Sequence, residues 1–138
     1  PKAGLHFGFP YIHASSVIDP EFGAPVFPVE PPVVELGPHV APLAMKFYTG
    51  TMFPERYRGE IFIAEHGSWN RTPEAGHTGY NITMVNPETG ATTILIDGWL
   101  KNNVAWGRPT DILEMPDGSL LIADDHANVI YRLTYETP

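Results

Sequence analysis

The sequence contains no cysteine, which excludes disulfides, thiolate metal sites and a cysteine nucleophile. It is also poor in basic residues, because 8 Lys and Arg stand against 16 Asp and Glu, a formal net charge of −8. A surface that binds nucleic acid or an anionic membrane needs a basic stripe, so we expect neither kind of partner. No apolar run approaches the roughly 18 residues of a membrane-spanning helix.

Helical periodicity is absent as well, and 13 Gly with 15 Pro disfavour long helices. What the chain does have is a composition suited to one packed domain, with 43% hydrophobic and 12% aromatic residues. The first residue is Pro1 and no signal peptide is evident, so we expect a chain that has been processed or cut from something longer.

Two regions differ in character. Residues 1–37 are rich in proline and aromatics, which predicts an extended segment that packs on the rest of the chain. Residues 38–138 read as strands and turns, and the fold class is therefore all-β. The expected strands are Leu43–Tyr48, Glu60–Ala64, Tyr80–Val85, Thr92–Ile96, Asp111–Met115, Ser119–Ala123 and Val129–Leu133.

An internal repeat refines this fold class. The segment from Gly59 to His66 recurs from Gly118 to His126, with the two glycines 59 positions apart, and the copies end in Glu65-His66 and Asp124-Asp125-His126. Four-stranded units at periods of about 40–60 residues are typical of β-propeller blades. We therefore expect about two blades, residues 38–103 and 104–138, the second of which must take its fourth strand from another segment. A seven-stranded β-sandwich is the alternative.

Several motifs carry a family resemblance over nearly the whole chain. The sequence resembles the C-terminal third of the sorbosone and glucose dehydrogenase family. The matching segments are Phe7-Gly8-Phe9-Pro10-Tyr11, Leu36-Gly37-Pro38-His39-Val40-Ala41-Pro42, Phe62-Ile63-Ala64-Glu65-His66-Gly67-Ser68-Trp69-Asn70-Arg71, Met115-Pro116-Asp117-Gly118-Ser119-Leu120 and Asp124-Asp125-His126-Ala127. The resemblance implies a six-bladed propeller, and in many members pyrroloquinoline quinone (PQQ) and calcium that serve to oxidise sugars. It also suggests a bacterial periplasmic or soluble protein, although the sequence itself leaves the localisation unknown.

Strand parity predicts where the polar residues gather. In an antiparallel blade the first strand begins at the end of the sheet where the second strand finishes. The residues just before each first strand and just after each second strand should therefore lie at one rim. The candidate metal ligands there are His39, His66 and His126, with zinc, manganese or calcium as the ion. The candidate catalytic residues are Glu65, Asp124, Asp125 and Arg108. For any single histidine a solvated loop residue is the alternative, and Asp124-Asp125 are alternatively a turn that caps backbone amides.

Two further assignments rest on the resemblance. Arg108 matches a family position where arginine contacts the carboxylates of the quinone, and alternatively it pairs with Asp111 or Asp125. Thr110 stands where quinone-binding relatives often have a second basic residue, and we assign it to the same cofactor site.

Two blades cannot close a ring, so we expect a homo-oligomer, with a trimer giving six blades. The expected function is a metal-dependent hydrolase of esters, lactones or phosphoesters acting on a small-molecule substrate. One alternative is a PQQ- and calcium-dependent sugar dehydrogenase or a fragment of one. The other is a non-catalytic scaffold that binds carbohydrate.

Overall fold

The computed structural model describes residues 3–136, which divide into two compact units, the first ending at Glu35 and the second beginning at Leu36. The first unit contains one short hairpin, formed by β1 (Ile12–His13) and β2 (Val17–Ile18). Aromatic rings hold this unit together, with Tyr11 packed edge-on against Phe22 and Phe27. Proline restricts the rest of the unit to irregular backbone.

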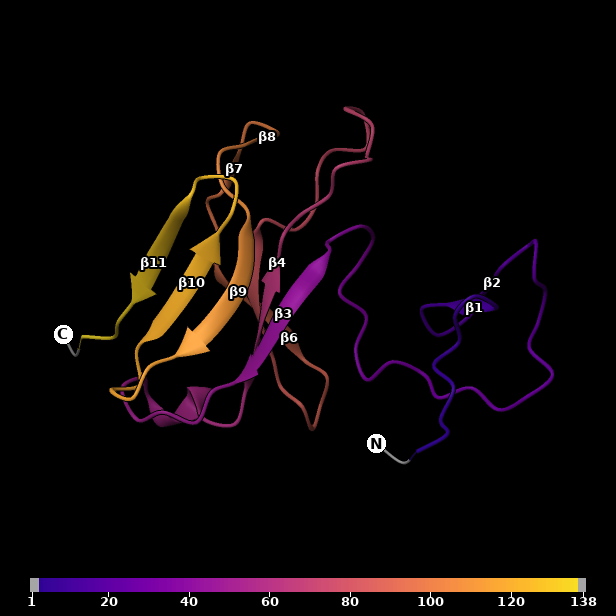
Figure 1. The fold of residues 1–138 in the computed structure, drawn as a ribbon, viewed down its shortest axis with the longest axis horizontal. Coiled ribbons are helices and arrows are strands. Elements are labelled where there is room, and N and C mark those ends of the chain that lie inside the picture. The colour runs from indigo at the N-terminus through magenta and orange to yellow at the C-terminus, as the bar shows by residue number, and fades with distance from the viewer. Residues whose placement is uncertain (1–2, 137–138) are drawn as a thin grey trace. The chain divides into compact units, whose positions relative to one another are not determined.

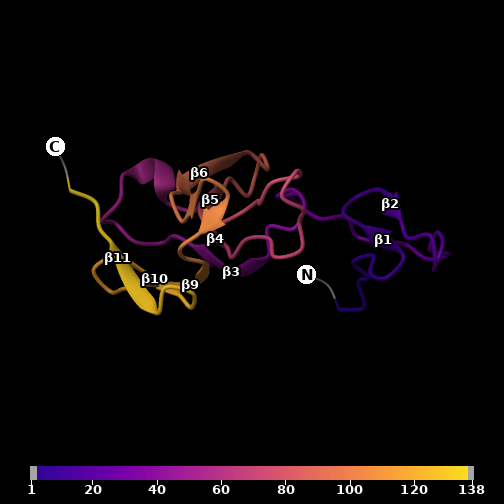
Figure 2. The ribbon, with the colours of Figure 1, turned by 90° about the horizontal axis from the view of Figure 1, so that it is seen from above.

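The second unit contains a four-stranded antiparallel sheet in which the strands follow one another in chain order (Figures 1 and 2). Its strands are β3 (Pro42–Phe47), β4 (Ile61–Glu65), β5 (Asn81–Val85) and β6 (Thr92–Ile96). A one-turn 3-10 helix, η1 (Glu55–Tyr57), lies between β3 and β4. The turn from β5 to β6 is closed by Asn86, whose Oδ1 accepts the backbone N–H groups of Glu88 and Thr89.

A three-stranded antiparallel sheet follows, in the order β9–β10–β11, with β9 (Pro109–Glu114), β10 (Leu120–Asp124) and β11 (Val129–Leu133). The hairpin of β7 (Leu100–Lys101) and β8 (Val104–Ala105) precedes it. The two hairpin turn residues, Asn102 and Asn103, both have positive φ, as a type I′ turn requires.

The two sheets share one core, and their first strands, β3 and β9, lie side by side. Alternation along the strands directs Phe62, Ile82, Ile112 and Ile122 into this core. Tyr48 joins the sheets directly, because it is fully buried and its hydroxyl donates to the carbonyl of Gly118 at 2.9 Å.

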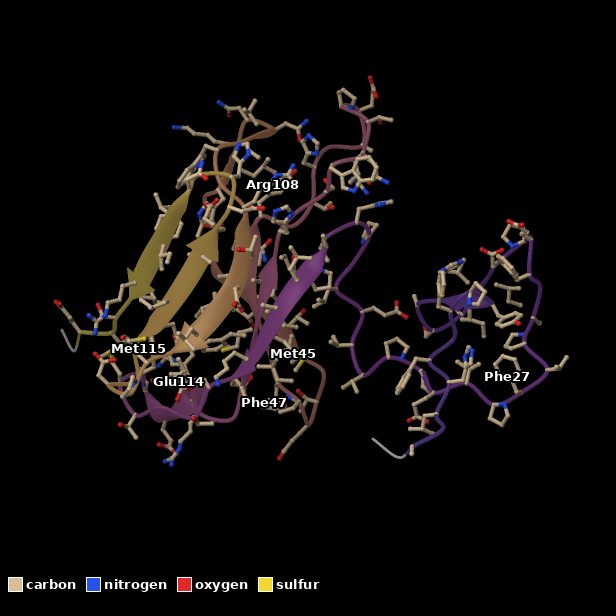
Figure 3. The ribbon with its side chains drawn as sticks, viewed as in Figure 1. Phe27, Met45, Phe47, Arg108, Glu114 and Met115 are labelled. Carbon is tan, nitrogen blue, oxygen red and sulfur yellow. The ribbon has the colours of Figure 1, made fainter. Side chains whose placement is uncertain are left out.

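Other apolar side chains point out of the sheets. Met45 and Phe47 of β3 are about half exposed on the face of the first sheet turned away from the core (Figure 3). Leu113 of β9 and Ile130 of β11 are similarly exposed on the outer face of the second sheet. Each sheet therefore exposes some apolar side chains on the face turned away from the shared core.

The structure confirms the all-β class and places a strand within two residues of each of the seven expected ones. It shows several antiparallel sheets rather than a closed propeller. The two-residue strands β1, β2, β7 and β8 were not expected, because such short segments carry no alternation to detect. Among residues 3–136 the one helix is η1, so no described helix is of a length to cross a membrane.

Candidate functional site

The polar residues singled out in the sequence lie at one end of the two sheets, which we call the rim. It is the end where β3 and β9 begin and where β4 and β10 finish, opposite the end that carries Glu114 and Met115 (Figure 3). Backbone bonds from His66 N to Ala41 O (3.0 Å) and from Gly67 N to Val40 O (2.9 Å) extend the first sheet here. His39 and His66 therefore belong to adjacent segments of the rim.

Arg108, immediately before β9, is half-buried between the two sheets. Its guanidinium stacks on the ring of Tyr80 at 4.9 Å and donates to the Tyr80 hydroxyl at 3.1 Å. It also reaches the carbonyls of Gly67 and Ser68, but at 3.3 and 3.4 Å these bonds are long and weak. No carboxylate oxygen of residues 3–136 lies within 4.0 Å of its nitrogens. The rim thus holds a partly desolvated positive charge whose acceptors are neutral.

His66 and Asp125 meet across the two sheets, with Nε2 of His66 3.0 Å from Oδ1 of Asp125. When Nε2 carries the proton and donates it to Asp125, Nδ1 of His66 is left as an acceptor. The pair can therefore hold an imidazole in one tautomer at the rim, ready to accept a proton at Nδ1.

Glu65 and Asp124 are enclosed instead, at 4% and 3% exposure. Glu65 accepts a hydrogen bond from the Thr83 hydroxyl at 2.8 Å, and burial raises the pKa of its carboxyl. Asp124 accepts from the backbone N–H groups of Arg108 and Ala127 and from the Tyr131 hydroxyl. Their predicted catalytic roles remain predictions, but the Asp124 contacts correspond to the turn-capping alternative.

The remaining predicted site residues lie at the same end of the sheets but do not converge on one site. His39 and His126 are exposed, and His39 has a left-handed backbone with φ of 61°. Thr110 donates its hydroxyl to the carbonyl of Ala123 at 3.1 Å and lines a shallow depression with Asp124, Asp125 and Val129. Arg108 does not line that depression, so the two residues assigned to one cofactor site face different surroundings.

The predicted metal site is wrong. No group of three His, Asp or Glu side chains within residues 3–136 is arranged to hold a metal ion. The reason is geometric: of the three predicted histidine ligands, His66 is paired with Asp125, while His39 and His126 are exposed in separate loops. Parity correctly predicts the end of the sheet at which these residues sit, but not the directions of their side chains.

Several residues that shape the rim were not predicted from the sequence. Tyr80 is buried, supports Arg108 and donates its hydroxyl to the carbonyl of Ser68. Gly67 must be glycine, because a Cβ would lie 2.4 Å from the Tyr80 ring at a φ of 94°. Gly107 is equally confined, since a Cβ there would lie 2.2 Å from Asp124 Oδ2. The sequence did contain a sign that these glycines matter, because Gly67 directly follows His66 and Gly107 directly precedes Arg108.

Comparison with known proteins gives three matches. The TrAA12-like family model matches residues 27–135. An uncharacterized protein of Borreliella burgdorferi is 41% identical over 140 residues, which cover 95% of this chain and 36% of that protein. The solved structure "Iodide structure of Trichoderma reesei Carbohydrate-Active Enzymes Family AA12" superposes with a TM-score of 0.51 at 23% identity, over 68% of this chain and 24% of that chain. The chain thus spans about a third of its curated relative.

These matches correct two expectations. The family is not the sorbosone and glucose dehydrogenase family, and a metal-dependent hydrolase is not supported. The motifs misled for a physical reason: Met115-Pro116-Asp117-Gly118-Ser119-Leu120 describes a hairpin turn in which Asp117 accepts from Ser119, a geometry that different sheet proteins share. Since the family model covers most of the chain, this protein belongs to the TrAA12-like family.

Proposed function

We propose that this chain forms part of the cofactor site of a PQQ-dependent carbohydrate oxidoreductase. The family relationship supports this class of activity, because members of AA12 bind PQQ and oxidise carbohydrates. The observation that carries the proposal is the half-buried guanidinium of Arg108, which has no carboxylate partner within the described chain.

The chemistry of the rim suits such a cofactor. PQQ carries three carboxylates, and when bound it would supply a quinone able to take two electrons from a sugar. A guanidinium offers paired donors to a carboxylate, and charge-assisted bonds are the stronger kind. Stacking on Tyr80 orients the Arg108 guanidinium for binding a carboxylate. Its two long hydrogen bonds to the carbonyls of Gly67 and Ser68 are weak enough to be replaced by bonds to that carboxylate.

The other rim residues have supporting tasks. Tyr80 fixes the plane of the Arg108 side chain, and its own hydroxyl is held by the carbonyl of Ser68. Asp125 orients His66 so that Nδ1 can accept the hydroxyl proton of a sugar. Asp124 accepts the backbone N–H of Arg108 and so fixes where the side chain starts.

Quinone binding by the 138-residue chain tests this proposal. PQQ is titrated into wild-type, Arg108→Gln and Arg56→Gln proteins by equilibrium dialysis. Arg56 is a matched control because it also stacks on a tyrosine, Tyr57, at 4.7 Å, but at the other end of the sheet and in solvent. We expect Arg108→Gln to weaken binding at least about tenfold and Arg56→Gln to leave it unchanged. No binding by the wild type, or equal binding by Arg108→Gln, would overturn the proposal.

We also propose that the two sheets are successive propeller blades. Both are antiparallel meanders with neighbouring first strands, and the apolar faces at Met45 and Leu113 suit further sheets of the same kind. Copies of this chain, expected from the sequence as a trimer, are our proposed source of those sheets. Light scattering tests it: a mass of three times 15.2 kDa supports the assembly, and a monomer mass overturns it.

A further inference from the structure

Trp69 is the feature of the rim that the proposed cofactor site leaves unexplained. Its side chain is 80% exposed, although exposing an indole in water is unfavourable and Trp is usually well buried. It lies in the loop between β4 and β5, which extends beyond the sheet at the same end as Arg108 (Figures 1 and 3).

The loop that carries Trp69 is restrained by hydrogen bonds on both sides of this residue. Ser68, directly before it, is buried, and its Oγ lies 3.0 Å from His77 Nδ1 and accepts the Thr78 N–H at 3.1 Å. Arg71, two residues after it, donates to the carbonyls of Ala75 and Gly76. Trp69 is therefore exposed on a loop that hydrogen bonds restrain on both sides of it.

This position is adjacent to the proposed cofactor site. Arg108 contacts the carbonyls of Gly67 and Ser68, the two residues that immediately precede Trp69. The next residue, Asn70, is exposed and offers an amide that can donate and accept hydrogen bonds. A flat aromatic face with an amide beside it matches a pyranose ring, which has one face of C–H groups and an edge of hydroxyls.

We propose that Trp69 is a stacking platform for a neutral pyranose ring at the rim, with Asn70 as a hydrogen-bond partner for its hydroxyls. This inference rests on the proposed carbohydrate oxidoreductase function and assigns the sugar to named residues. Trp69 is thereby a substrate-positioning residue, distinct from the residues that hold the quinone.

Saccharide binding to the quinone-free chain tests the platform. Cellopentaose and maltopentaose are titrated while tryptophan fluorescence is followed, and affinity is measured separately by calorimetry. We expect the wild type to bind at least one of them, Trp69→Phe to bind more weakly, and Trp69→Ala to lose about tenfold in affinity. Trp106→Phe is the matched control, because Trp106 is half-exposed but its Nε1 donates to the carbonyl of Gly98; this variant should bind as the wild type does.

The outcomes separate this inference from the proposed function. Because the Trp69 side chain is exposed, Trp69→Ala should fold normally and keep the quinone affinity of the wild type. Saccharide affinity that is unchanged in Trp69→Ala, or absent in the wild type, overturns the platform even when quinone binds. Saccharide binding that depends on Trp69 in a chain with no quinone affinity supports the platform and overturns the cofactor site.

Discussion

Nε2 of His66 and Oδ1 of Asp125 lie 3.0 Å apart, although the two residues are 59 positions apart in the chain and belong to different sheets. This hydrogen bond joins the end of β4 to the end of β10 at the rim. It connects equivalent places of the internal repeat, because each residue follows the second strand of its own sheet.

We expect this bond to contribute little to stability. Asp125 is 63% exposed and His66 is 21% exposed, so water competes for both groups. A double-mutant cycle with His66→Ala and Asp125→Ala, measured by urea unfolding, should give a coupling free energy below about 1 kcal/mol. A coupling free energy above about 2 kcal/mol would contradict this prediction, because it would show that the His66–Asp125 bond is important for the stability of the fold.

Asp124, the neighbouring residue, should behave in the opposite way. Asp124→Ala removes the acceptor of the Arg108 and Ala127 N–H groups and of the Tyr131 hydroxyl in a buried place. We expect a loss of about 2–4 kcal/mol in the free energy of unfolding, and a smaller loss for Asp124→Asn, which keeps one oxygen. Asp125→Ala is the control. Equal stability of Asp124→Ala and Asp125→Ala would contradict the buried-cap role.

Gly107 tests how closely the rim is packed. A Cβ at this position would lie 2.2 Å from Asp124 Oδ2 and 2.4 Å from Trp99 Cδ1, and both side chains are buried. Gly107→Ala should therefore lower the free energy of unfolding by about 2 kcal/mol or more. Gly98→Ala is the control, because a Cβ there meets nothing within 4 Å and only its positive φ of 111° opposes the change. A smaller loss for Gly107→Ala than for Gly98→Ala in thermal unfolding would refute the packing argument.

Glu65 should give the protein a distinct pH dependence. Burial raises the pKa of Glu65 in the folded state, so the native chain holds this proton more tightly than the unfolded chain does. The stability from this group is then present below the ordinary glutamic acid value of 4.5 and is lost as pH rises through the raised value. Relative to wild type, Glu65→Gln should become more favourable as pH increases across that window. Melting temperatures of both proteins between about pH 4 and 8 check this, and a difference with the opposite trend would contradict it.

Much of the fold was predictable because it depends on local patterns. Alternating apolar residues locate β3 to β6 and β9 to β11, and Asn86 and Asp117 locate two of the turns. Asn102 and Asn103 also carry the signal of a type I′ hairpin, although this hairpin was not among the predicted elements.

The site was predictable only in its coarse location. Strand parity is a property of the backbone, so the sequence by itself determined that Glu65, His66, Arg108 and Asp124 share one end of the sheets. It could not determine which of them face solvent, because that depends on how the two sheets meet. Tertiary packing alone buries Glu65 and Asp124, and it pairs His66 with Asp125. It also stacks Arg108 on Tyr80 and leaves this cation with neutral acceptors. The physical reason is that these contacts join residues far apart in the chain, which meet only when the two sheets pack together.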